Sequence, residues 1–235
     1  MLRPLLFLWL LLCAAPAAAD VTGRYRNGDQ TMSIEVNDAG LTRLGQDGGD
    51  SYTIFNGDEG FIVSNEGGGT VVMRWSDMVA VLDAEVARLL GETPGPAPEP
   101  QESAERWQTV GPATVEGRAG VEYSFPGETM APGDTIVLSD DSRLAPLGRA
   151  WARAFAMMPT FGGLFGRTEA PATRQLAALL AGRAPLQLGA IRLIDADFET
   201  IDSGRFALPG EPLSRDEVAA QFRDRTQANL AENPQ

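Results

Sequence analysis

The sequence predicts an α+β protein in which helices cover the dry face of a large antiparallel sheet. Turn sequences such as Asn27-Gly28-Asp29 and Asn56-Gly57-Asp58 recur about every 9 to 11 residues near the N-terminus, a spacing typical of an antiparallel meander. Between the turns, apolar and polar residues alternate, as they do in strands with one buried face. Helix-period patterns occupy later segments, and these can bury that face.

The first 19 residues have the features of a secretory signal peptide. Arg3 precedes an apolar run from Leu5 to Leu12, and Ala17-Ala18-Ala19 provides a small-residue cleavage site. We therefore predict cleavage after Ala19 and a periplasmic or secreted mature protein of residues 20–235.

No membrane anchor is expected in the mature chain. Leu12 precedes Cys13, whereas lipid attachment needs a small residue before the cysteine. No later apolar run reaches the roughly 18 residues that span a bilayer. We predict no stable membrane insertion after signal cleavage.

The composition excludes several kinds of chemistry. All 19 basic residues are arginines, the chain has no histidine, and Cys13 is its one cysteine. A mature chain without Cys13 cannot form a disulfide, a thiolate nucleophile, a zinc–thiolate site, a lysine Schiff base or a histidine base. We predict a protein that is not an enzyme and that uses no cofactor and no metal.

The charge disfavours anionic partners. The formal net charge is −13, and loss of Arg3 with the signal peptide makes it −14. Such a surface repels nucleic acid and anionic lipid head groups. We therefore expect no nucleic-acid partner.

Residues 20–75 are expected to form six strands with one apolar face. In the segment TMSIEV, for example, Met32 and Ile34 alternate with Ser33 and Glu35. The predicted dry face, which would form one wall of a ligand site, consists of Met32, Ile34, Tyr52, Ile54, Val71, Met73 and Trp75.

An amphipathic helix is predicted directly after these strands. Ser76 or Asp77 can cap it, Val79 and Leu82 begin an apolar stripe at helical spacing, and Gly91 ends it. The proline-rich residues 92–105 follow and are expected to form an exposed, extended loop. A linker between two domains is the alternative to a loop within one domain, which we favour.

The rest of the chain continues the same mixture of elements. Strands are predicted in residues 107–125, 134–141, 184–202 and 205–209. Helices are predicted from about Ser142 into the segment AFAMM, and in residues 171–183. Ser214 and Glu217 form a capping box that starts a final helix.

The C-terminal third carries a family resemblance. It contains Gly-x-x-Pro-Leu, a long acidic strand and Phe-x-x-Pro, represented by Gly182, Pro185, Leu186, Phe206 and Pro209. With the order of elements, this pattern resembles the periplasmic lipoprotein-carrier superfamily typified by LolA and LolB, and is most similar to a related group of secreted bacterial domains of unknown function. The resemblance implies a curved antiparallel sheet, an unclosed barrel, with helices packed in its concave side and an apolar cavity between them.

The segment AFAMMPTFGGLFG, residues 154–166, allows two interpretations. Its apolar side chains can continue a helix up to Pro159 and then fold back onto the core. Alternatively, its methionines and its Gly162-Gly163 pair can line or cover a cavity for an acyl chain or an apolar protein tail. In that case the second wall of the site consists of Phe155, Met158, Phe161, Leu164 and Phe165.

Acidic residues near the C-terminus do not predict a metal or catalytic site. Asp195, Asp197 and Glu199 alternate along a strand, so they are expected on its wet face, with Ala196 and Phe198 facing inward. Their spacing lacks the loop and central glycine of an EF-hand. No pair of carboxylates can be chosen for glycosidase chemistry without spatial information.

These observations favour a binding or carrier module for an apolar or amphipathic ligand, such as a lipid or a lipoprotein acyl chain. The alternative is a cell-envelope interaction module whose sheet is filled by its own helices and which holds no ligand. An enclosed apolar cavity of about 300 Å³ or more would favour the carrier, whereas a filled core would favour the interaction module.

Overall fold

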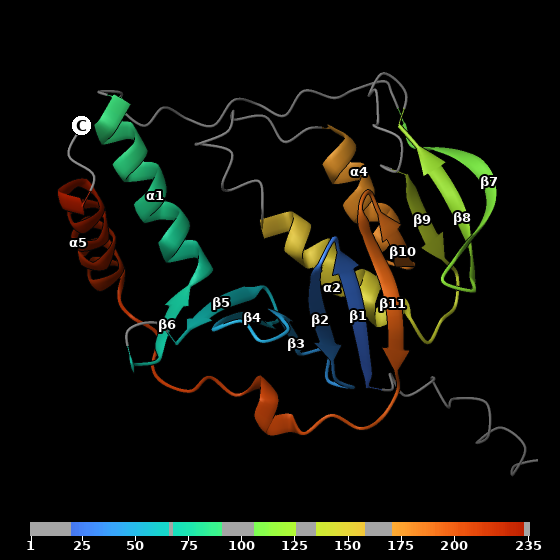
Figure 1. Cartoon of the computed structure of the whole chain (residues 1–235), viewed down its shortest axis with the longest axis horizontal. Coiled ribbons are helices and arrows are strands. Elements are labelled where there is room, and N and C mark those ends of the chain that lie inside the picture. The colour runs from blue at the N-terminus through green and yellow to red at the C-terminus, as the bar shows by residue number, and fades with distance from the viewer. Residues whose placement is uncertain (1–19, 66–67, 91–105, 126–134, 158–170, 233–235) are drawn as a thin grey trace, which may run out of the picture.

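The structure, a computed structural model, describes residues 20–65, 68–90, 106–125, 135–157 and 171–232 (Figure 1). The strands are β1 (Val21–Asn27), β2 (Gln30–Val36), β3 (Thr42–Gln46), β4 (Ser51–Asn56), β5 (Glu59–Ser64), β6 (Val71–Arg74), β7 (Gln108–Val115), β8 (Arg118–Ser124), β9 (Ile136–Ser139), β10 (Ala184–Leu188) and β11 (Ile191–Asp197). The helices are α1 (Trp75–Leu90), α2 (Ala145–Met157), α4 (Pro171–Leu180), the 3-10 helix η3 (Ser203–Phe206) and α5 (Arg215–Glu232).

One 11-stranded antiparallel sheet contains every one of these strands, in the order β6-β5-β4-β3-β2-β1-β11-β10-β9-β8-β7. The six strands expected before residue 75 are present and form one half of it. The first strand of the chain, β1, pairs with the last, β11, and this pair joins the two halves. The sheet does not close into a barrel, which confirms the predicted α+β class with an unclosed, curved sheet.

Helix α2 fills the middle of the concave face, which we call the helix face. It packs against β1, β2 and β10, and α4 packs against α2 (Figure 1). Leu147 and Trp151 of α2 are buried there with Tyr25, Ile34 and Leu193 of the sheet. This cluster is the main hydrophobic core.

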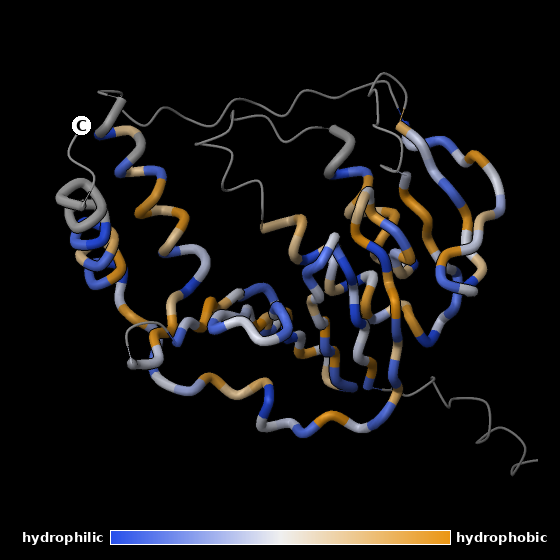
Figure 2. Tube along the Cα trace, in the orientation of Figure 1, coloured by the Kyte–Doolittle hydropathy of each residue, from blue (hydrophilic) through white to orange (hydrophobic). Residues whose placement is uncertain are grey.

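The central strands explain why part of the sequence does not alternate. Every residue of β9 and of β10 is buried, so both strands are covered on both faces. Such strands have continuous apolar stretches, and Figure 2 shows β9 as apolar along most of its length.

A second, smaller core lies on the outer face of the sheet, opposite the helix face. Residues 198–214, which we call the strap, connect β11 to α5, and the strap residue Leu208 packs against this core. The Leu213 amide donates to the Val72 carbonyl oxygen of β6 at 2.8 Å. The buried members of this core are Ile54, Phe61, Val63 and Val72.

The prediction of one continuous dry face is therefore wrong for Tyr52 and Ile54. The register pairs Ile34 with Leu44 and Leu44 with Thr53, so Thr53 shares the helix face with Ile34. Tyr52 and Ile54 alternate with Thr53 and lie on the outer face. Strand β4 has a buried apolar side chain on each face, since Ile54 is 1% exposed and its neighbour Phe55 is 3% exposed. The alternation pattern therefore led to the wrong face for Tyr52 and Ile54.

Three smaller predictions are also corrected. Trp75 begins α1 and is not part of a strand. The segment predicted as a strand at residues 205–209 begins inside η3, because the Asp202 side chain accepts from the Gly204 amide at 2.9 Å and caps a helical turn. Phe198 is 39% exposed and does not face inward, since β11 ends at Asp197.

The capping box at the last helix is confirmed. The Ser214 amide donates to Glu217 Oε2 at 2.8 Å, and the Glu217 amide donates to Ser214 Oγ at 3.4 Å. The proline-rich residues 92–105 lie outside the described residues. None of the helices described in Figure 1 is both long and apolar enough to cross a membrane.

Candidate functional site

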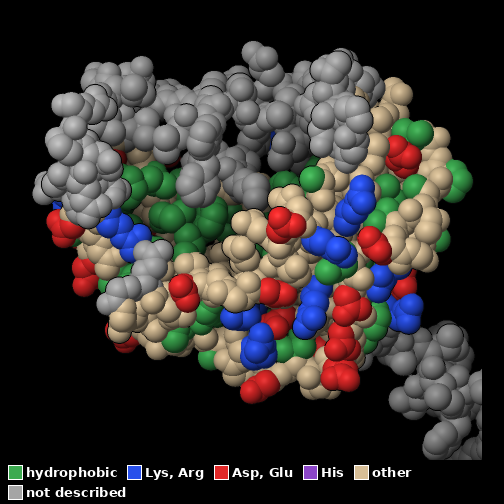
Figure 3. All heavy atoms as spheres, viewed as in Figure 1, with side chains coloured by type: hydrophobic (Ala, Val, Ile, Leu, Met, Phe, Trp, Pro, Cys, Tyr) green, Lys and Arg blue, Asp and Glu red, His purple; other side chains and the backbone are tan. Residues whose placement is uncertain are grey.

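A groove lies between α1 and the C-terminal end of α2, above the turn that joins β4 to β5. Its volume is about 440 Å³. Figure 3 shows apolar side chains gathered between these elements, on the face toward the viewer. The lining residues are Asp58, Glu59, Gly60, Arg74, Trp75, Ser76, Val79, Ala80, Asp83, Ala156 and Met157.

The base of the groove is held together by α1 and α2 themselves. Trp75, the first residue of α1, donates from Nε1 to the Met157 carbonyl oxygen at 3.2 Å. The Met157 side chain lies over Gly60, where an added Cβ would stand 2.7 Å from its sulfur. Glycine at this position therefore lets the end of α2 approach the start of β5.

One wall of the groove is apolar because of the helical period of α1. Val79 and Ala80 lie one turn after Trp75, and Val79 is 4% exposed. Ala156 and Met157 form the opposite wall on α2. Methionine adapts to irregular apolar partners, so this wall can accommodate more than one ligand shape.

The rim of the groove is mainly acidic. Asp58, Glu59 and Asp83 face one cation, Arg74. The Arg74 guanidinium lies 4.0 Å from Glu59 and 3.9 Å from Asp77, and Asp77 also pairs with Arg215 of α5 at 3.1 Å. A neutral or cationic ligand head group is electrostatically better suited to this rim than an anionic one.

The structure places Trp75, alone among the predicted ligand-binding residues that it describes, in the lining of the groove. Met32 and Ile34 belong to the main core under α2, and Tyr52 and Ile54 lie on the outer face. Val71 and Met73 are on the helix face of β6, since Met73 pairs with Ile62 and Val71 with Ser64. Phe155 stacks on Trp151 with ring centroids 5.7 Å apart. Met158, Phe161, Leu164 and Phe165 lie outside the described residues.

Four apolar lining residues were not predicted as ligand contacts: Val79, Ala80, Ala156 and Met157. The sequence assigns Val79 to the apolar stripe of a helix, and that stripe was interpreted as a cover for the sheet. Only the separation of α1 and α2 in the described structure shows that part of this stripe also lines a groove.

The described residues show no converging catalytic or metal-binding group. No cluster of three acidic residues suited to a metal ion occurs among them. The largest perturbation is at Tyr25, where complete burial raises the pKa of the phenol above its ordinary value. The neighbouring Trp151 side chain and the charge of Arg118 lower this pKa in part.

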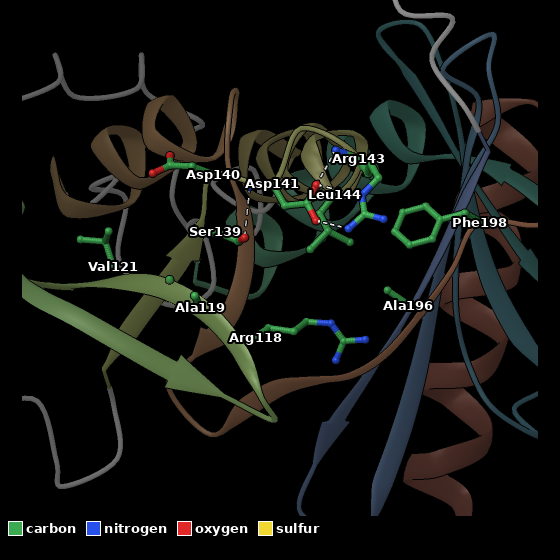
Figure 4. A pocket seen from close by; sticks show the side chains of 11 residues that line it. Arg118, Ala119, Val121, Ser139, Asp140, Asp141, Arg143, Leu144, Ala196 and Phe198 are labelled. Carbon is green, nitrogen blue, oxygen red and sulfur yellow. Dashed lines mark hydrogen bonds and ion pairs between the residues drawn. The ribbon is translucent and has the colours of Figure 1, made fainter.

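A second and larger cavity, about 580 Å³, lies on the other side of the molecule, between β8 and β11 (Figure 4). The β9–α2 connection, residues 140–144, enters this space from above. No sequence pattern indicated it, because its two walls, β8 and β11, are distant in the sequence. We call it the cleft.

Comparison with known proteins identifies no relative: no family model, no curated protein and no solved structure matches the chain.

Proposed function

We propose that the protein is a periplasmic binding or carrier module, without catalytic chemistry, for an apolar or amphipathic ligand such as a lipid acyl chain. The groove between α1 and α2 is the observation that carries this proposal. Its volume of about 440 Å³ falls within the range of about 300 to 1,000 Å³ that is usual for small-molecule sites.

The lining of the groove supports an amphipathic ligand in particular. The apolar walls from Val79 and Met157 suit a hydrocarbon chain, while Asp58, Glu59 and Asp83 at the rim suit a neutral or cationic head group. The element order that resembles the lipoprotein carriers favours the same kind of ligand, and the predicted signal peptide supports a location of the protein in the cell envelope.

The second candidate is a cell-envelope interaction module that holds no ligand. One observation favours it: α2 already fills the centre of the concave face, where Leu147 is 0% exposed and Trp151 is 3% exposed. In this case the groove would be a surface depression with no occupant.

A single substitution in the groove tests the proposal. Trp in place of Ala80 would project an indole from α1 into the space where the ligand is expected. We expect Ala80→Trp to weaken binding of an uncharged naphthylamine dye, which fluoresces in apolar surroundings, by about tenfold or more. The measurement is a fluorescence titration of the mature protein.

The matched control is Ala178→Trp, which adds the same side chain at an exposed position of α4. It should leave the dissociation constant of the dye unchanged. Equal dye binding by both variants, or no dye binding by the wild type, would contradict the carrier proposal and leave the interaction module as the better account.

A further inference from the structure

The cleft exists because two pairs of neighbouring strands separate at this end of the sheet. β10 pairs with β11 only through Gln187–Arg192 and Leu188–Ile191, so the end of β11 has no partner on that side. β8 pairs with β9 only from Val121 onward, so its first three residues extend beyond β9. The end of β11 and the start of β8 thus form opposite walls of an open space.

The cleft wall on β8 is fixed by local backbone geometry. Glu116 and Gly117 join β7 to β8 with positive φ angles of 47° and 78°, as in a type I′ hairpin turn. Arg118 follows and pairs with Val115 across the hairpin. At Gly120 an added Cβ would lie 2.8 Å from the Leu138 carbonyl oxygen, so glycine is needed for this close crossing of β9.

Arg118 is directed into the cleft. Figure 4 shows its side chain extending from the start of β8 across the space toward Ala196 of β11. The residue is half-buried, and no hydrogen-bond acceptor or ion-pair partner for its guanidinium occurs among the residues of the five described ranges. A guanidinium carries five N–H donors in a planar fork that matches carboxylate and phosphate oxygens.

The carboxylates beside Arg118 are already neutralised by other arginines. Asp140 accepts from Arg183 Nε at 2.8 Å, and Asp141 accepts from Arg143 Nη2 at 2.7 Å. The hydrogen bond from Arg143 holds the pKa of Asp141 below its usual value, so this carboxylate stays ionised and paired. Within the described ranges the charge of Arg118 is therefore uncompensated, in a chain whose net charge is −13.

The remaining lining offers a hydroxyl and an apolar face. Ser139 is 4% exposed, and its Oγ accepts from the Asp141 amide at 3.2 Å, which leaves its own O–H proton without an acceptor in the described part of the chain. Phe198 lies at the edge of the cleft, with the Arg143 guanidinium 5.1 Å from its ring centre. This ring can contact the apolar part of a ligand.

We propose that the cleft binds a small organic ligand through its oxyanion, a carboxylate or a phosphate. Arg118 donates two parallel N–H bonds to the oxyanion, the Ser139 hydroxyl donates a third bond, and Phe198 packs against the apolar part. This site is separate from the α1–α2 groove, whose acidic rim suits a different class of ligand, so the two proposals stand independently.

The test is a titration of the mature, isotopically labelled protein with benzoate, phenyl phosphate and benzyl alcohol, followed by amide NMR shifts. Benzyl alcohol has the ring but no charge. We expect benzoate or phenyl phosphate to shift the amides of Ala119, Gly120 and Asp141 in a saturable way, and benzyl alcohol to bind about tenfold more weakly or worse. Tighter binding of one of the two anions identifies the oxyanion as carboxylate or phosphate.

Two variants connect the binding to Arg118. Arg118→Gln should raise the dissociation constant of the preferred anion by about tenfold or more. Arg118→Lys keeps the charge but loses the planar pair of N–H donors, so its dissociation constant should lie between those of the wild type and Arg118→Gln. Arg24→Gln is the matched control, because it removes the same charge at an exposed position outside the cleft. Amide spectra of each variant establish that it is folded.

Three outcomes would overturn the proposal. They are equal binding of benzyl alcohol and the anions, equal weakening by Arg118→Gln and Arg24→Gln, and the absence of saturable shifts at the cleft of the wild type.

Discussion

Tyr25 is the largest of the fully buried side chains described, and its hydroxyl is one of the buried polar side-chain atoms that have no hydrogen-bond partner among the described residues. Its ring makes an edge contact with Trp151, with centroids 5.4 Å apart, and both Tyr25 Oη and Trp151 Nε1 are buried without a hydrogen bond among the described residues. A buried hydroxyl that makes no hydrogen bond loses the interaction that it has with water in the unfolded chain. The tyrosine oxygen is therefore expected to destabilise the core.

We predict that Tyr25→Phe leaves the free energy of unfolding unchanged or raises it by about 1 kcal/mol, because it removes the unsatisfied oxygen and keeps the ring. Tyr123→Phe is the matched comparison, since the Tyr123 hydroxyl accepts a hydrogen bond from Arg183. Loss of this hydrogen bond should lower the free energy of unfolding by about 1 to 3 kcal/mol. Urea denaturation measures both, and a similar loss in both variants would show that the Tyr25 hydroxyl has a partner.

At the residue scale, the sequence predicted which side chains of one strand share a face but not which face the next strand presents. Side chains alternate with a period of two, so the correct identification of Ile34 as a core residue follows from β2 alone. The face on which Tyr52 and Ile54 lie depends on the register between β3 and β4, because a shift of one residue moves every side chain of a strand to the opposite face. Their neighbour Phe55 is also apolar and buried, so composition could not decide.

At the element scale, turn chemistry predicted most strand and helix positions correctly. Gly28, Gly40, Gly48 and Gly57 have positive φ angles between 59° and 79°, and each lies in a turn between strands of the meander. Glycine adopts this conformation without steric cost, so the turns are visible in the sequence. The cavities are not visible there, because they depend on how α1, α2, β8 and β11 meet.

Both edges of the sheet are protected by local features. Strand β6 forms one edge of the sheet, and the backbone amide of Leu213 in the strap donates a hydrogen bond to it. At the other edge, β7 has a register shift between Thr109 and Gly111, followed by Pro112. A bulge and a proline both hinder pairing with another chain, so the exposed Val110 at this edge does not by itself indicate a docking site.

The crossing of α2 over the α4–β10 connection depends on one glycine. A Cβ at Gly148 would clash with the carbonyl oxygens of Leu180 and Arg183 and lie 2.7 Å from the Arg183 carbonyl carbon. These are backbone atoms, which cannot rotate away. In an isolated helix, Gly→Ala would stabilise the helix by about 1 kcal/mol. At Gly148 the close packing makes the same substitution destabilising.

We therefore predict that Gly148→Ala lowers the free energy of unfolding by about 3 kcal/mol, because α2 or the α4–β10 connection must move. Arg149→Ala, at the exposed neighbouring position of α2, should change it by less than about 0.5 kcal/mol. Thermal and urea denaturation provide the measurement. A neutral or stabilising effect of Gly148→Ala would show that the two elements are farther apart than described.

At the scale of the whole molecule, the two ends of the chain hold the fold together. β1 and β11 are separated by most of the sequence and pair over five residue positions. The strap adds a second connection, in which Arg205 donates to Glu35 of β2 at 2.9 and 2.5 Å. Glu35 is 7% exposed and also lies 3.6 Å from Arg43. Such non-local pairings could not be predicted from local sequence patterns.

The same non-local arrangement creates the two cavities that carry the functional proposals. The α1–α2 groove has apolar walls and an acidic rim, and the cleft holds Arg118, which has no ion-pair partner in the described part of the chain. The sequence predicted a ligand wall on the sheet, whereas α2 packs against β1, β2 and β10, and the strap packs against the outer core on β4, β5 and β6. Among the described residues, the apolar groove lies between helices.

Native mass spectrometry of the protein, isolated from the envelope of cells that produce it, tests the central proposal most directly. We expect wild-type protein to carry a lipid adduct of reproducible mass, and Ala80→Trp, isolated in the same way, to have lost it, since the indole occupies the groove. Wild-type protein that is free of any adduct and takes up no dye would contradict the account.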